Sequence, residues 1–319
     1  MFLVRGLAVS FSIFFLVYAG LSLAVAAGSK AIVRLCRAWR SPRRVAGFLF
    51  WMRVLPLAAA LSVTVLVVVP SFLLLEPRAE SEELSLLSVV LGCAGLGAVL
   101  FGLRNAAFAV RQTARVVRGW RLGAQAFSGS DALPVFLMNP EVRPACAIAG
   151  IVHPEVFVSK AAVAVLSGAE LESVIRHEVV HGRRWDNLRK LLFRVCAFPG
   201  MGLIADVWAD ATEAAADEAA VSSSEEALDL AAALVKISRL VAIPGARPEP
   251  ELTMALVQPG TALPARVERL VGWRQPEAPS ARLAGATYLS GLVAAGMCAL
   301  LYGSILACAH AATEWLVTR

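Results

Sequence analysis

The residues best suited to chemistry lie in the segment VIRHEVVHGRRWDN, at positions 174–187. His177 and His181 are four residues apart, so on a helix they share one face and their imidazoles can converge on a single cation. Glu178 follows the first histidine directly. This H-E-x-x-H spacing is typical of zinc peptidases, in which the histidines bind the metal and the glutamate is the general base. The sequence therefore predicts one catalytic zinc ion.

Two histidines leave a catalytic zinc ion short of a protein ligand, because such sites commonly take three. His153 precedes a proline between predicted strands and His310 ends a hydrophobic stretch, so neither is a good third ligand. Four carboxylates follow on a predicted alanine-rich helix at 207–221: Asp210, Glu213, Asp217 and Glu218. Glu213 and Asp217 share a helix face, so one could bind zinc while the other accepts the free N–H of a ligand histidine.

A helix and a small sheet are predicted to position these residues. Ser167 and Glu170 have the spacing of a capping box and start the helix that carries the motif. Three short apolar runs bounded by proline and glycine predict strands at 134–138, 145–151 and 155–159. We expect ACAIAG, within the second run, to be an edge strand that holds an extended substrate by β-augmentation.

The overall composition is that of a membrane protein. The chain has 319 residues, of which 58% are hydrophobic and 17% charged, whereas soluble domains carry about 25% charged residues. Uncharged stretches long enough to cross a bilayer as helices lie at 6–29, 54–75, 84–103 and 283–313. A cleaved signal peptide is the alternative for the first stretch. We favour a retained helix, because the apolar run is long and basic residues follow it.

Arginine-rich flanks orient these helices in the cytoplasmic membrane. The segments 30–53 and 104–121 are basic and are predicted to be cytoplasmic, whereas EPRAESEE, at 76–83, is acidic and is predicted to lie outside. The chain then divides into a three-helix region at 1–122, a cytoplasmic α+β domain at 123–282, and a fourth helix with a short outer tail at 283–319.

The net charge of +6 comes mainly from these flanking arginines. Because the basic clusters adjoin hydrophobic spans, anionic lipids are the expected partner, and nucleic-acid binding is not expected. The six cysteines are scattered without a C-x-x-C pair, so they predict neither a disulfide framework nor a cysteine zinc site. The oligomeric state is not predicted.

Two longer segments resemble a known family. HPEVFVSKAAVAVLSGAELESVIRHEVVHGRRWDN and EAAADEAAV are similar to the integral-membrane zinc peptidases typified by the BlaR/MecR β-lactam sensor-transducers. LPARVERLV, at 263–271, resembles their late R-V-x-R-L element, and the predicted order of spans matches theirs. The resemblance implies a predominantly α-helical membrane protein with a gluzincin-like α+β peptidase domain between its third and fourth transmembrane helices.

Carried over by position, the resemblance implies zinc bound by His177, His181 and Glu213, with Glu178 as the base. It makes Asp217 the partner of His177. Arg184 and Asp186 match the R-x-D after the second histidine, and we expect them to brace the helix end. All three tyrosines lie in predicted spans, so the oxyanion has no phenolic donor within the domain, and Arg183 and Asn187 are the remaining side-chain candidates.

The sequence also departs from that family. The sensor-transducers carry a large extracellular penicillin-binding domain after the last helix, which this sequence lacks, so we expect a different trigger. The expected function is regulatory cleavage of a cytoplasmic or membrane-associated protein, for example a transcriptional repressor. The alternatives are an HtpX-like quality-control protease and a non-catalytic zinc-fold scaffold. The hydrophobic connection at 196–208 either packs as an interhelical loop or contacts the membrane through Leu203 and Ile204 and gates the site.

Overall fold

The computed structural model describes residues 2–76, 85–127, 133–138, 145–241, 252–255, 263–274 and 302–318. The chain forms two compact units. Unit 1 comprises Met1–Ala27, Val54–Phe101 and Pro276–Arg319, and unit 2 comprises Gly28–Arg53 and Gly102–Gln275.

Three helical stretches among the described residues are long and apolar enough to span a membrane: α1 (Phe2–Arg37), α2 to α3 (Pro42–Leu75) and α4 (Leu86–Arg121). Within the second, α2 (Pro42–Val63) continues through a π-helical turn, η1 (Thr64–Val68), into α3 (Val69–Leu75). The prediction of apolar, membrane-length helices is confirmed for these three stretches, which is consistent with a membrane protein. Most of the predicted fourth span lies outside the described residues, and α12 (Tyr302–Thr318) covers its end.

The three predicted spans are embedded in longer helices. Both α1 and α4 have 36 residues, which at 1.5 Å per residue gives about 54 Å, against about 30 Å for a hydrocarbon core. The surplus length of each helix belongs to unit 2, as does the first half of α2. The domain boundary predicted at residue 122 lies just after α4, whereas the second unit also takes in residues 102–121.

Unit 1 combines close helix packing with buried charge. A Cβ atom at Gly95 on α4 would collide with the backbone carbonyl of Phe11 on α1, so the glycine allows these two helices to approach closely. Arg5 Nη2 lies 2.6 Å from Glu76 Oε1, and both side chains are less than a tenth exposed. His310 Nδ1 on α12 lies 3.6 Å from the other oxygen of Glu76. The rest of the predicted outer loop lies outside the described residues.

Unit 2 is built on a mixed five-stranded sheet in the order β1-β2-β4-β3-β5. The three predicted strands are confirmed as β2 (Val135–Met138), β3 (Cys146–Ala149) and β4 (Glu155–Ser159). Two further strands, β1 (Gln125–Phe127) and β5 (Thr253–Ala255), pair antiparallel with β2 and β3 respectively. Only the β2–β4 pair is parallel among the described strands.

The prediction that ACAIAG forms an edge strand is wrong. β3 pairs with β4 on one side, where Ile148 lies opposite Val156, and with β5 on the other, where Ile148 lies opposite Met254. The backbone hydrogen-bonding groups of β3 are therefore taken on both sides by the chain itself. The sequence did not reveal this because β5 has three residues and lies about a hundred positions downstream of β3, with only a weak local signal of its own.

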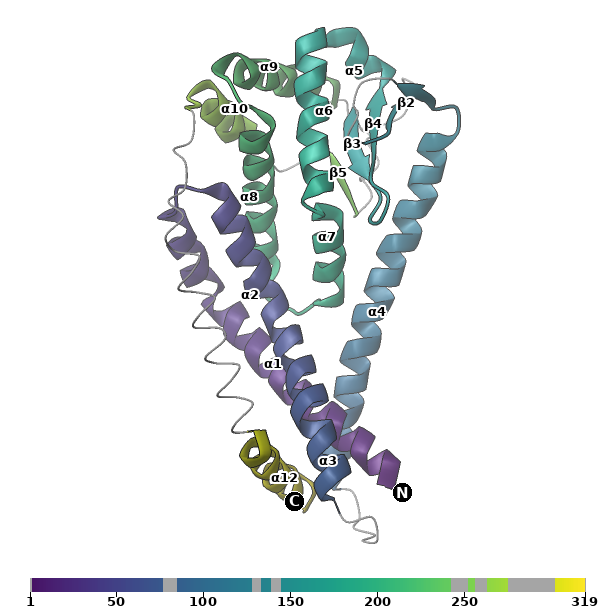
Figure 1. Ribbon diagram of the computed structural model, residues 1–319, viewed down its shortest axis with the longest axis vertical. Coiled ribbons are helices and arrows are strands. Elements are labelled where there is room, and N and C mark those ends of the chain that lie inside the picture. The colour runs from purple at the N-terminus through teal and green to yellow at the C-terminus, as the bar shows by residue number, and fades with distance from the viewer. Residues whose placement is uncertain are drawn as a thin grey trace. The chain divides into compact units, whose positions relative to one another are not determined.

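Helices cover both faces of this sheet. The end of α4 covers one face, where Trp120 packs against Phe157 with ring centroids 5.5 Å apart. On the other face, α6 (Gly168–Arg183) packs on β3 and β4 and joins the main core (Figure 1). The remaining helices of unit 2 are α5 (Lys160–Val165), α7 (Asp186–Val195), α8 (Gly202–Ala220), α9 (Ser224–Val241) and α10 (Leu263–Val271). The two residues of the proposed gate, Leu203 and Ile204, lie in the first turn of α8.

Candidate metal centre

The motif helix begins where the sequence predicts. Ser167 Oγ accepts a hydrogen bond from the backbone N–H of Glu170, and Glu170 Oε2 accepts one from the backbone N–H of Ser167. This capping box starts α6, and Val174 and Ile175 then bury its apolar face in the core. Because four residues make about one helical turn, His177 and His181 project from the same face, and each is at most 2% exposed.

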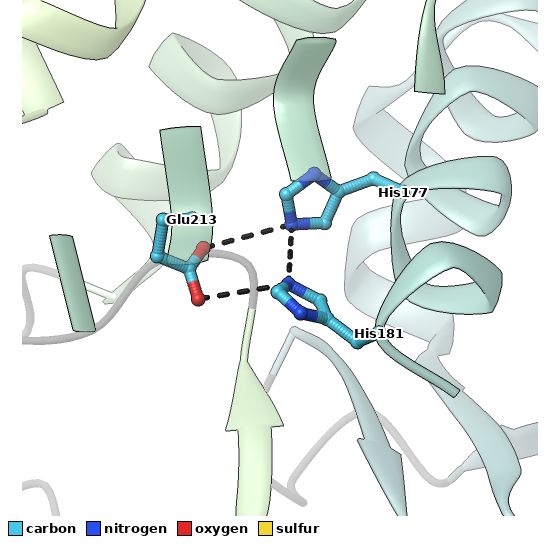
Figure 2. Close-up of side chains that lie close together, drawn as sticks. All are labelled: His177, His181 and Glu213. Carbon is cyan, nitrogen blue, oxygen red and sulfur yellow. Dashed lines mark hydrogen bonds and ion pairs between the residues drawn. The ribbon is translucent and has the colours of Figure 1, made fainter. Parts of the chain in front are cut away.

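A second helix brings a carboxylate to these histidines. Glu213 lies on α8, and its two carboxylate oxygens are each 3.6 Å from one histidine Nε2 atom. The two Nε2 atoms are 3.1 Å apart (Figure 2). Small side chains permit this approach, because four buried alanines surround the glutamate on α8: Ala211, Ala214, Ala215 and Ala216.

The three side chains fit a metal ion. Their candidate ligand atoms all lie within 4.8 Å of one another and are buried. In a tetrahedral zinc site with ligand distances near 2.0–2.1 Å, neighbouring ligand atoms are about 3.3 Å apart. The observed separations of 3.1, 3.6 and 3.6 Å bracket that value. The group formed by His177, His181 and Glu213 could therefore bind a metal ion with little rearrangement.

Each histidine is oriented by a carboxylate on its other ring nitrogen. His177 Nδ1 lies 3.1 Å from Asp217 Oδ1, and His181 Nδ1 lies 2.8 Å from Asp186 Oδ2. A proton on Nδ1 held in this way leaves the lone pair of Nε2 directed toward the metal position. Asp217 is thus beside the histidine that the family resemblance implies, and Asp186 contacts the second ligand as well as the helix end.

No protein-family model matches the sequence, and no curated protein matches it.

Asp186 reaches His181 because the chain turns sharply after α6. Trp185 has φ 57°, and it has the only left-handed backbone among the non-glycine residues that the structure describes. For a residue with a Cβ atom, this conformation costs about 1–2 kcal/mol. The turn at Trp185 lets α7 begin at the next residue, Asp186. A carboxylate in a first helical turn is favoured by the helix dipole.

Arg266, the first residue of the R-V-x-R-L segment, had no role predicted from the sequence, and it completes the charge balance of the site. This arginine on α10 is 4% exposed. Its Nη2 and Nε atoms donate hydrogen bonds of 2.7 and 2.8 Å to the two carboxylate oxygens of Asp217, and Nη1 lies 3.0 Å from Glu213 Oε2. Two signals were available: the R-V-x-R-L resemblance, which includes Arg266, and its spacing, which places it on one helix face with the apolar Leu263 and Leu270.

Burial and neighbouring charges shift the titration of the ligands. Burial alone would lower the pKa of His177, but the nearby carboxylates of Asp217 and Glu213 outweigh it and raise the pKa to about 9. Burial lowers the pKa of His181, despite the opposing carboxylates. Burial would raise the pKa of Glu213, but Arg266 and the two histidines hold it at about 2. Without a metal ion, His177 and Arg266 thus carry the positive charge of the site.

Glu178 lies within the same buried group of side chains. It is 0% exposed, and no side chain among the described residues donates a hydrogen bond to its carboxylate oxygens. Burial, together with the negative charge of Glu213, raises its pKa to about 8, although His177 and Arg266 oppose the shift. A fully buried carboxylate with a raised pKa is costly to ionise, and such groups are concentrated at functional sites.

The other predicted site residues lie around this group. Arg184 caps the end of α6, with Nε 3.8 Å from Asp186 Oδ2. Arg183 is exposed. The Asn187 amide nitrogen donates to the backbone carbonyls of Gly150, at 2.9 Å, and Ile148, at 3.4 Å, and so ties the start of α7 to the end of β3. Asp210 and Glu218, which the sequence left open as ligands, are outside the group that could hold a metal ion.

Proposed function

We propose that this protein is a zinc-dependent endopeptidase of the cytoplasmic membrane. One observation carries the proposal: two histidine Nε2 atoms and a glutamate carboxylate face one another at metal-site distances, beside the fully buried carboxylate of Glu178. Two imidazoles, one carboxylate and an adjacent base are the donor set of thermolysin-like metallopeptidases. The family resemblance of the H-E-x-x-H and E-A-A-A-D segments independently supports the same function.

The residues take distinct roles in this proposal. His177, His181 and Glu213 would hold the zinc ion, which when bound polarises the scissile carbonyl and makes water more acidic. Glu178 accepts the proton of the attacking water and passes it to the leaving amine. A nearby cation favours the ionised form of Glu178, which the role of base requires. Asp217 and Asp186 keep the Nδ1 protons of the histidines, so that both Nε2 lone pairs stay available.

The closed state of the site supports regulated cleavage. His177, Glu178, His181 and Glu213 are each at most 2% exposed. A polypeptide substrate therefore reaches them only after neighbouring elements move. We propose that the substrate is a cytoplasmic or membrane-associated protein that is cut when the site opens. Anionic lipid at the basic segments that flank the spans would keep the domain at the membrane surface.

The decisive test combines metal content with cleavage. Detergent-purified full-length protein and its Glu178→Gln variant would be assayed for bound zinc, self-cleavage and casein cleavage. We expect one zinc ion in each and cleavage by the wild type alone, since Gln keeps the shape but cannot act as a base. Zinc in both proteins without cleavage in either would favour the scaffold function, and the absence of zinc from the wild type would refute the proposal. Broad cleavage of membrane proteins near the cytoplasmic boundary would instead favour quality control.

A further inference from the structure

The short helix α7 connects the metal centre to a membrane helix within unit 2. Its first residue, Asp186, is 0% exposed and uses its two oxygens differently. Oδ2 lies 2.8 Å from His181 Nδ1, and Oδ1 accepts a hydrogen bond of 3.2 Å from Arg189 Nη1. Arg189 therefore restrains the carboxylate that orients a candidate metal ligand.

Arg189 is itself held by a residue of α2. Its guanidinium lies over the ring of Phe50, 5.5 Å from the centroid, which is a favourable cation–π distance. The same ring stacks on Phe193, which lies one turn further along α7, with centroids 5.9 Å apart and an interplanar angle of 18°. Phe50 thus contacts α7 at two places, and these two contacts restrain both the position and the rotation of α7.

The contact extends to the helix that carries the third candidate ligand. Phe193 packs against Trp208 of α8 with centroids 4.7 Å apart, and these two side chains are 9% and 2% exposed. Glu213 follows on α8 a little more than one turn after Trp208. The guanidinium of Arg53, one turn after Phe50 on α2, lies over the Phe193 ring, 5.9 Å from its centroid.

We propose that Phe50 and Arg189 are positioning residues for the metal centre. Phe50, near the start of α2, packs against α7. Arg189 donates a hydrogen bond to Asp186, and Asp186 in turn orients His181. The helix α2 extends to Val63 in unit 1, so a membrane-spanning helix contributes directly to the geometry of the metal ligands. A rotation or shift of α2 would then change the metal site without any contact to the metal. The inference rests on the proposed metal site and not on peptidase activity.

The test compares two phenylalanines on the same helix. Phe48 and Phe50 are both half-buried, but Phe48 packs on Trp39 in the connection between α1 and α2, with centroids 5.1 Å apart, whereas Phe50 contacts α7. Full-length Phe50→Ala, Phe50→Tyr and Phe48→Ala proteins would be compared by hydrogen exchange of the peptide 184–192 in metal-free protein. Their zinc dissociation constants would be measured with a competing chelator.

We expect Phe50→Ala to exchange about tenfold faster in that peptide and to bind zinc about tenfold more weakly, at the lower end of what the loss of an outer-shell partner costs. Phe50→Tyr, which keeps the ring, should behave as the wild type, and so should Phe48→Ala. Unchanged exchange in 184–192, or faster exchange throughout unit 2, would overturn the inference. A chain that binds no zinc would refute the proposed function, and the exchange comparison would still decide whether Phe50 positions α7.

Discussion

Replacing Arg266 with methionine tests the charge balance of the metal centre. The side chain is 4% exposed and pairs with both Asp217 and Glu213. Methionine has a similar length but no charge, so two carboxylates would stay buried without their arginine. Arg266 is a principal reason why the pKa values of Glu213 and Asp217 are lowered. Removing one partner of a buried ion pair costs about 3–5 kcal/mol.

This loss is large enough to measure as a change in melting temperature. For a unit of about 150–250 residues, 1 kcal/mol shifts Tm by about 2–4 °C, so Arg266→Met should lower Tm by about 6–20 °C. Thermal unfolding of the metal-free, detergent-solubilised chain would be followed by tryptophan fluorescence. Added zinc should recover part of the loss, because the ion supplies positive charge beside Glu213.

Arg269 provides the matched control. It lies three residues away on α10 and is exposed, so Arg269→Met should change Tm by less than about 2 °C. If Arg266→Met melts like the wild type in the metal-free state, Arg266 does not compensate these carboxylates as the geometry indicates. A Tm loss that zinc leaves unchanged would show that the arginine acts on packing and not on the charge of the site.

Three further predictions concern the same unit. The pKa of His177 in the metal-free protein is raised to about 9, so zinc must displace a proton from His177 when the pH is below that value. Zinc affinity, measured by chelator competition, should therefore fall about tenfold as the pH decreases from 8 to 7. A zinc affinity that does not change with pH over this range would contradict the prediction. Asp186→Asn should raise the zinc dissociation constant about 10- to 100-fold in the same assay, and an unchanged value would show that the contact with His181 is unimportant. Gly150 has φ +102° and no room for a Cβ atom beside the His153 carbonyl. The Gly150→Ala variant should therefore destabilise unit 2 by more than about 1 kcal/mol. Thermal unfolding identical to that of the wild type would exclude this strain.

Local patterns were sufficient for the elements that carry the motif. The capping box at Ser167, the apolar stripe after it and the spacing of His177 and His181 all act within a few helical turns, so they predict α6 and its shared histidine face directly. The long uncharged stretches predict four membrane spans, and three of them fall in helices that are long and apolar enough to cross a membrane, because length and hydrophobicity are local properties of a segment.

Residues distant in sequence determined the rest, and these depend on packing. The residue pattern of the segment 207–221 offered four carboxylates as candidates for the third ligand. The approach of alanine-rich α8 to α6 brings Glu213 to the histidines. Arg266 and β5 reach the site and the sheet from far downstream. A short strand or a single buried arginine has almost no local signal, since its stability comes from the partners that the fold brings to it. The sequence therefore determined the helix that carries His177 and His181 and the three membrane-length apolar helices, and tertiary packing decided which charges surround the candidate metal ligands and which strands flank β3.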